Sequence, residues 1–450
     1  MDLEQWTVGG RQFGLVLVWL LIAGEFYTTF TFLGACGWAY SKGAPVLYVV
    51  AYQPLGCVIG FFVLPRLWEV GRRHRLQTLA DFFVVRFRSE RLGALVALIG
   101  VAFLIPYLQL QLTGLGIIVE VASDHAVGRT PAMLIAFLLV AAFVSASGIR
   151  GVAWVSVLKD ALMLVTVLVV GLTIPYLYFG GLAPMFTALE RANPGHLVLP
   201  GSTRDLGHAW YITTVLLSAV GVPMWPHFFA ANLSARSADT LRRNAMILPL
   251  YGITVPLVLF VGLAATLLLP RLGNGDLAML ALVRRTFPPW FLGVVGGAGA
   301  LTAMVPAAIL ILSASTLFAK NLVRPMFAPQ MSDAAVARLA RRTVFLVTGI
   351  ALLLAMHGSR TLVALLLLGY AGIAQFFPGV VLGLFWPPIR KSAVAAGLLV
   401  GIGLTAALMA SGHDPWHGLN AGFAGLCANL LVTVGFSLRV PADRAGSRAA

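Results

Sequence analysis

The stretch that decides the fold is FGLVLVWLLIAGEFYTTFTFLGACGWAY, residues 13–40. It is long enough to cross a membrane, because a spanning helix needs about 20 apolar residues. It also carries Gly24 and Glu25 near its middle. A carboxylate inside a span is costly unless it lies in a protected interior. We therefore expect a membrane helix that is interrupted at these two residues.

A second stretch has a comparable interruption: HAWYITTVLLSAVGVPMWPHFFAANL, residues 208–233. Pro223 and Pro226 cannot donate the backbone hydrogen bonds of a continuous helix, and His227 follows directly. Interrupted spans at corresponding places of two halves point to the binding site of a secondary transporter. The sequence predicts a solute transporter whose substrate lies between the two breaks.

Apolar residues fill the rest of the chain. The 450 residues are 59% hydrophobic and only 10% charged, which excludes a soluble domain. We predict an all-α polytopic membrane protein with about twelve transmembrane helices. The predicted spans are 13–41, 44–67, 92–122, 131–149, 152–179, 208–233, 244–270, 290–319, 340–357, 361–386, 392–411 and 418–437.

The net charge of +15 is a topology signal rather than a nucleic-acid footprint. Of the 31 Lys and Arg residues, 22 fall on one predicted side of the membrane, 8 on the other, and Lys159 within a span. By the positive-inside rule, we expect both termini to be cytoplasmic. We also expect the protein to lie in the inner (plasma) membrane. We expect the lipid bilayer and a small solute as partners, and no nucleic acid.

The chain shows no signs of an enzyme. Its three cysteines have neither zinc nor disulfide spacing, and no cluster of carboxylates or histidines suggests a catalytic metal. We expect no cofactor and no metal, other than Na⁺ or H⁺ as a coupling ion.

The predicted organisation is a single transport domain over residues 1–437. Its first and sixth spans run in opposite directions, so we expect inverted repeats over about 13–179 and 208–386. Residues 392–437 are then peripheral helices, and 438–450 form a short cytoplasmic tail. The oligomeric state is left open.

Several runs together resemble the sodium:solute symporter family, over roughly residues 6–385. The runs are Trp6–Arg11 (WTVGGR), Thr31–Tyr40, Leu76–Phe83 (LQTLADFF), Pro106–Tyr107 with Gln111, Gly151–Trp154 (GVAW), Trp225–His227 and Lys320–Leu322. The resemblance implies a leucine-transporter-type fold of five plus five inverted helices, with discontinuous helices 1 and 6, and ion-driven uptake.

Within that family, the chain looks most like the bacterial monocarboxylate permease branch, a relative of the pantothenate and proline permeases. The branch-like runs are Gly24–Phe30 (GEFYTTF), Trp225–His227 and Val305–Ala308 (VPAA). The branch implies import of a small monocarboxylate such as lactate, pyruvate or alanine. Alternatives are another small solute (pantothenate, proline or another organic acid) and a transporter-like membrane sensor.

The chain also departs from the family pattern. The resemblance implies a sodium site with two hydroxyl side chains on core helix 8, but Val305 and Pro306 occupy those places. It implies a second-site aspartate two residues after a Trp, where this chain has Ser156, with Asp160 one turn later. Family members usually carry one more helix before the Gly-Gly-Arg run.

The ion-coupling candidates surround the first break. Sodium would bind backbone carbonyls at Ala23, Gly24 and Glu25, whereas protons would use Glu25 and His227. Glu25 and His227 also have structural readings, as groups that hydrogen-bond backbone freed by the breaks. Asp160 is a further ion-coupling candidate, although Lys159 and Asp160 are better explained as a structural ion pair.

The substrate-binding candidates are hydroxyl, amide and aromatic side chains. A half-helix N-terminus favours an anion, so Thr28, Thr29 and Thr31 are candidates, although threonines also bond their own helix. The remaining candidates are Gln111, Trp225 and His227. Gln111 can equally join two helices, and Trp225 can equally pack in the core.

Overall fold

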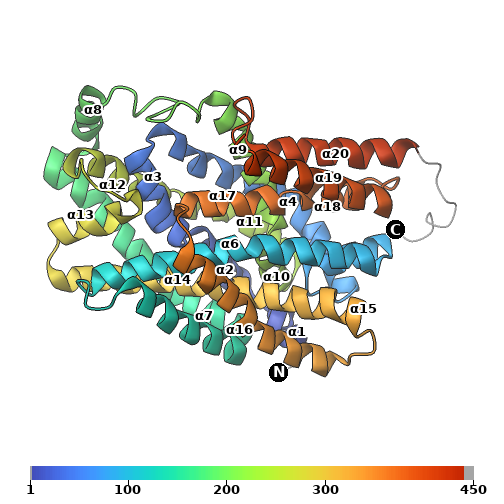
Figure 1. The fold of residues 1–450 in the computed structure, drawn as a ribbon. Coiled ribbons are helices and arrows are strands. Elements are labelled where there is room, and N and C mark those ends of the chain that lie inside the picture. Colours follow the sequence, from blue (N-terminus) through green and yellow to red (C-terminus); the bar gives the residue numbers. More distant parts are fainter. Residues whose placement is uncertain (1–2, 440–450) are drawn as a thin grey trace.

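The computed structural model describes residues 3–439. Over these residues the secondary structure is helical, with two isolated β-bridges, Phe13 with Ala235 and Trp416 with Leu419. The helices form a bundle whose long axis is horizontal in Figure 1. Helices α8 (Leu182–Ala192) and α13 (Ala278–Thr286) lie at one end of this bundle, and α15 (Arg324–Phe327) lies at the other (Figure 1).

Both predicted breaks are present. In the first broken span, α2 (Leu15–Phe26) is followed by the π-helix η2 (Phe30–Ala35) and by α3 (Cys36–Ser41), with a bend of 45°. In the second, α9 (His208–Gly221) and the short 3₁₀-helix η4 (Val222–Met224) meet α10 (Pro226–Leu233) at 46°.

Nine further segments within residues 3–439 are long and apolar enough to cross a membrane. They are η3 with α4 (Ala44–Arg73), α6 (Glu90–Ala122), α7 (Arg129–Phe179), α11 with α12 (Ala238–Leu268), α14 (Pro289–Thr316) continued by η6 (Leu317–Val323) and α15, α16 (Asp333–His357), α17 with α18 (Leu362–Phe385), α19 (Lys391–Ala410) and α20 (Ala421–Arg439).

Helix α7 accounts for two of the predicted spans. Its 51 residues would measure about 77 Å as a straight helix, more than twice the hydrocarbon core of a bilayer. The helix is interrupted at Gly148, whose φ of 58° and ψ of −161° are not helical. When α7 is counted as two spans joined at Gly148, residues 3–439 contain the two broken spans, the two parts of α7 and eight other spans. This total equals the twelve spans predicted from the sequence.

Short helices connect or cover these spans: α1 (Leu3–Val8), η1 (Gly9–Arg11), α5 (Leu79–Phe87), α8, η5 (Gly275–Leu277) and α13. Helices α19 and α20 pack side by side at one edge of the bundle (Figure 1), where the sequence predicts peripheral helices. The core that positions the site consists of α2, α6, α7, α10, α11 and α14, which contact one another around the two breaks.

Candidate functional site

The first break consists of Tyr27, Thr28 and Thr29, between the end of α2 and the start of η2. Tyr27 is extended, with φ −93° and ψ 90°. The Thr28 hydroxyl accepts a hydrogen bond from the Phe30 amide at 3.2 Å, and the Thr31 hydroxyl donates to the Phe26 carbonyl at 2.5 Å. Thr28 and Thr31 therefore satisfy backbone groups that the missing helical turn leaves open. This is the structural role that the sequence offered as their alternative.

Thr29 and Gln111 meet across the break. The Thr29 amide donates to Gln111 Oε1 at 3.4 Å, while the Thr29 hydroxyl and Gln111 Nε2 have no hydrogen-bond partner within residues 3–439. Gly114 on α6 allows this approach, because a Cβ there would collide with the Thr29 side chain. Gln109 instead donates to the Leu354 carbonyl at 3.0 Å. The two glutamines therefore make their hydrogen bonds on different faces of α6.

The second break is built by proline. Pro223 lies within η4, Trp225 is extended with φ −61° and ψ 127°, and Pro226 opens α10. Neither proline has an amide hydrogen, so this break leaves fewer backbone donors unsatisfied than an interruption without proline. His227 follows Pro226 and is fully buried.

Glu25 and His227 bring the two breaks together. His227 Nε2 lies 3.5 Å from Glu25 Oε2, and neither side chain is exposed. Among the described residues, neither carboxylate oxygen and neither ring nitrogen has a hydrogen-bond partner. Buried polar groups are usually satisfied, so a proton, an ordered water or a substrate group can still be accommodated here.

A small cavity adjoins this pair. Its volume is about 10 Å³, roughly enough for one water molecule. Its lining includes the polar and aromatic residues Glu25, Thr28, Tyr52, Tyr107, Trp225 and Tyr370. A three-carbon acid is larger than one water, so this conformation is closed around the site.

Trp225 is the centre of an aromatic cluster at this cavity. Its ring lies 5.1 Å from that of Tyr107, 5.3 Å from that of Tyr370 and 5.4 Å from that of His227, measured between centroids. Tyr107 contacts His227 as well, at 5.7 Å. The binding set predicted from sequence did not include Tyr107, Tyr52 or Tyr370. A tyrosine after Pro106 was a usable signal, whereas Tyr52 and Tyr370 lie in otherwise plain apolar spans.

Lys159 and Asp160 approach the first break from α7. Lys159 Nζ donates to the Gly24 carbonyl and lies 3.4 Å from Asp160 Oδ1, and the Tyr251 hydroxyl of α11 donates to the same oxygen at 3.1 Å. Lys159 is fully buried and Asp160 is 2% exposed. The predicted ion pair is therefore present, and it has a backbone partner that the sequence did not indicate.

Two of the three backbone carbonyls predicted to bind sodium at the first break already accept hydrogen bonds. The Gly24 carbonyl accepts from Lys159, and the Ala23 carbonyl accepts from the Tyr27 amide at 3.2 Å. Val305 and Pro306 on the neighbouring α14 offer no side-chain oxygen.

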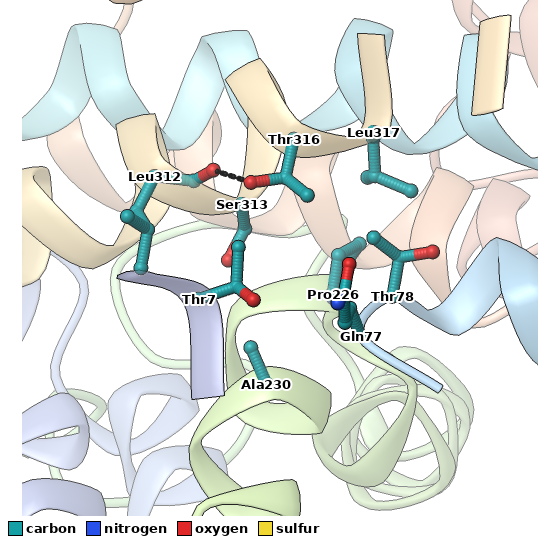
Figure 2. A pocket seen from close by; sticks show the side chains of 9 residues that line it. All are labelled: Thr7, Gln77, Thr78, Pro226, Ala230, Leu312, Ser313, Thr316 and Leu317. Carbon is teal, nitrogen blue, oxygen red and sulfur yellow. Dashed lines mark hydrogen bonds between the residues drawn. The ribbon is translucent and has the colours of Figure 1, made fainter. Parts of the chain in front are cut away.

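A second cavity of about 10 Å³ lies next to the second break, beside Pro226 and Ala230 of α10 (Figure 2). Thr7, Gln77, Thr78 and Ser313 line it together with Pro226, and the Ser313 hydroxyl has no hydrogen-bond partner in the described chain. Thr316, at its rim, donates to the Leu312 carbonyl at 2.7 Å, the dashed line in Figure 2.

A buried polar cluster ties α5 to η6, the continuation of α14, beside this second cavity. Asp81 accepts from Lys320 at 2.7 Å and from Asn321 at 2.8 Å, and Thr78 donates to Asn321 Oδ1 at 2.7 Å. Burial opposes ionisation of Asp81, but the Lys320 charge and the hydrogen bonds outweigh it and hold the pKa of Asp81 below its usual range. The cluster fastens the end of the bundle that is predicted to face the cytoplasm.

Comparison with known proteins identifies relatives over the whole chain. The model of the sodium:solute symporter family matches residues 6–401. An uncharacterised symporter of Bacillus subtilis, YhjB, is 43% identical, covering 97% of this chain and 92% of the relative. A monocarboxylate transport permease of Rhizobium johnstonii is 29% identical, covering 98% and 91%.

Solved structures agree on the fold. A Na⁺-coupled sialic acid symporter superimposes with a TM-score of 0.78 at 16% identity, over 98% of this chain and 93% of that one. The leucine-transporter-type fold predicted from sequence is confirmed. These relatives are transporters rather than enzymes, and a coupling sodium ion is consistent with both the family and this neighbour.

Proposed function

Because the chain belongs to the sodium:solute symporter family, we propose that it imports a small monocarboxylate such as lactate, pyruvate or alanine. The membrane would be the inner (plasma) membrane, with both termini in the cytoplasm. The name of the Rhizobium johnstonii relative supports this substrate class. The substrate would lie between the two breaks, in the cavity beside Glu25, Thr28 and Trp225.

The Glu25–His227 pair carries this proposal. It is a carboxyl group and an imidazole from opposite breaks, 3.5 Å apart, fully buried and without hydrogen-bond partners among residues 3–439. In such a position, the substrate carboxylate can replace Glu25 as the anion next to a protonated His227. The positive end of the helix dipole at the start of the η2–α3 half-helix and the Thr28 hydroxyl favour the same anion.

Charge neutrality then couples substrate to protons. Without substrate, the pair is neutral overall whether the proton is on Glu25 or on His227. When a carboxylate enters, neutrality requires Glu25 protonated and His227 cationic, which is one proton more than before. A buried net charge is strongly unfavourable, so each anion enters together with one proton.

Other ionisable groups surround the pair. Lys159 and Asp160 face Glu25 from α7 and form a neutral pair of their own, while Tyr107 faces both Glu25 and His227 from α6. The protonation change is therefore assigned to Glu25 and His227. Alternating access would require the closed cavity to open first on one side and then on the other.

Uptake of radiolabelled lactate and pyruvate into proteoliposomes tests the proposal. A pH gradient, acidic outside, should drive accumulation. A membrane potential imposed with potassium and valinomycin should not, because one anion with one proton carries no net charge. Absence of uptake of any small monocarboxylate would reject the substrate class. Uptake driven by the membrane potential alone would reject the coupling of one proton to each anion.

A further inference from the structure

The carbonyl at the first break is where a cation is expected. Helix α2 ends at Phe26, so the Gly24 carbonyl lies in its last turn, where carbonyls lose their helical partners and the helix dipole is negative. Sodium or an ammonium group can both neutralise this end. The structure has an ammonium group there, because Lys159 Nζ donates to the Gly24 carbonyl.

Lys159 is built into this position. It is fully buried, and a Cβ at Gly24 would lie 3.0 Å from its Nζ and 3.1 Å from Asp160 Oδ1. Glycine at this position therefore makes room for the pair. Asp160 in turn is positioned by the Tyr251 hydroxyl at 3.1 Å. Three elements, α2, α7 and α11, thus converge on this ion pair.

The α14 hydroxyl oxygens that the family resemblance implies for a sodium site are missing from the same region. Val305 and Pro306 are buried on α14, which packs against both α2 and α7, and they carry no side-chain oxygen. The Ala23 carbonyl is already bonded to the Tyr27 amide. The loss of hydroxyls on one helix and the buried ammonium on another are two independent observations with the same consequence.

We infer that Lys159 is a resident cation that occupies the place of a coupling sodium ion at the first break, so that transport by this chain does not depend on sodium. This inference deepens the proposed function and rests on it only where uptake is measured. A purely structural Lys159–Asp160 pair would stabilise the fold but would not affect sodium binding. Measurements of sodium binding therefore distinguish a resident cation from a structural ion pair.

Binding of ²²Na⁺ to the purified full-length protein tests the inference without any substrate. The wild type should show no saturable binding. Replacing the ammonium and restoring the hydroxyls, in the triple variant Lys159→Ala, Val305→Ser, Pro306→Ser, should create saturable binding. Saturable ²²Na⁺ binding by the wild type would overturn the inference, whether or not the triple variant folds.

Uptake into proteoliposomes gives the second arm. Wild-type uptake of lactate or pyruvate should be unchanged when K⁺ replaces Na⁺ on both sides. Lys159→Met should lower it about tenfold or more, since it leaves Asp160 buried without its cation. Lys159→Arg should retain part of the activity in either ion. Lys391→Met, at an exposed lysine on α19, is the matched control and should transport as the wild type does.

The outcomes separate the two proposals. Uptake that disappears without Na⁺, together with ²²Na⁺ binding, would overturn the resident cation and leave the monocarboxylate assignment intact. No uptake of monocarboxylates, together with no ²²Na⁺ binding by the wild type, would reject the substrate class and leave the resident cation in place.

Discussion

The two breaks bend their spans almost equally, by 45° and 46°, but they are held in different ways. The second is fixed covalently, because Pro223 and Pro226 cannot make the hydrogen bonds of a continuous helix. The first contains no proline, and its Gly24 carbonyl is held by a lysine from another helix. A bend fixed by proline persists in every conformation, whereas a bend held by a side chain can change when that side chain moves.

The chemistry divides in the same way. The first break supplies or contacts the charged groups Glu25, Lys159 and Asp160, while the second supplies Trp225 and His227. We therefore expect the first break to be the element that responds to ions, and the second to be a comparatively rigid wall that presents its rings to the substrate.

The largest expected effect is on stability, through the Lys159–Asp160 pair that contacts the first break. Lys159→Met should lower the free energy of unfolding by about 3–5 kcal/mol, because it leaves a buried carboxylate unpaired. Thermal denaturation in detergent measures it. The double variant Lys159→Met, Asp160→Asn should recover most of the loss. If the single variant is as stable as the wild type, the first break does not depend on this lysine.

The next effect concerns the link between the breaks. Glu25→Gln should reduce proton-driven net uptake about 100-fold, equivalent to about 2.7 kcal/mol, because the amide cannot relay to the buried His227 the proton that His227 gains when substrate enters. Exchange of internal for external substrate should continue, since it needs no net proton movement. Glu120→Gln, remote from the breaks, is the matched control. Loss of exchange and net uptake together would instead indicate that Glu25 is needed to bind substrate or to maintain the fold.

A smaller effect is expected in the polar cluster of Asp81, Lys320 and Asn321 beside the second cavity. Asp81→Asn should cost about 1.5–3 kcal/mol, the range for hydrogen bonds to charged groups. Since the pKa of Asp81 is lowered in the folded protein, its contribution is present above the unfolded value of about 3.9 and is lost only as the pH falls below it. The variant should therefore be destabilised equally at pH 5.5 and 7.5. A difference between these two pH values would contradict an ionised Asp81.

The smallest effect should follow from Pro223→Ala. Pro226 and the extended Trp225 still interrupt the span, so uptake should stay within about twofold of the wild type and stability should change by about 1 kcal/mol or less. Gly24→Ala is the matched change at the first break. It should be far more damaging, because its Cβ would lie 3.0 Å from Lys159 Nζ. Equal effects of the two substitutions would remove the distinction between the breaks.

Sequence reasoning located both breaks because proline, glycine and a carboxylate within apolar spans are visible one residue at a time. It could not establish that Glu25 and His227 lie opposite each other, because that depends on how two spans rotate and how deeply each is packed. The Gly24 carbonyl as the partner of Lys159 was missed for a related reason. Every residue carries a carbonyl, so a backbone acceptor leaves no signal in the sequence.

The threonines show the same limit at the scale of one turn. Thr28, Thr29 and Thr31 are adjacent in sequence and were equivalent candidates. In the structure, Thr28 and Thr31 bond the backbone of the break, and the Thr29 hydroxyl has no partner among residues 3–439. Which hydroxyl is available depends on the local path of the chain, and composition does not encode that path.

The contact between Lys159 and Gly24 also bears on how the protein is made. During synthesis, α2 enters the membrane before α7, and the Tyr251 hydroxyl on α11 is translated 91 residues after Asp160. A charged residue at the centre of a span costs about 2.5–3.5 kcal/mol on insertion. The carbonyl acceptor on α2 is already in the bilayer when Lys159 arrives, so the order of translation provides the first partner of this charge in advance.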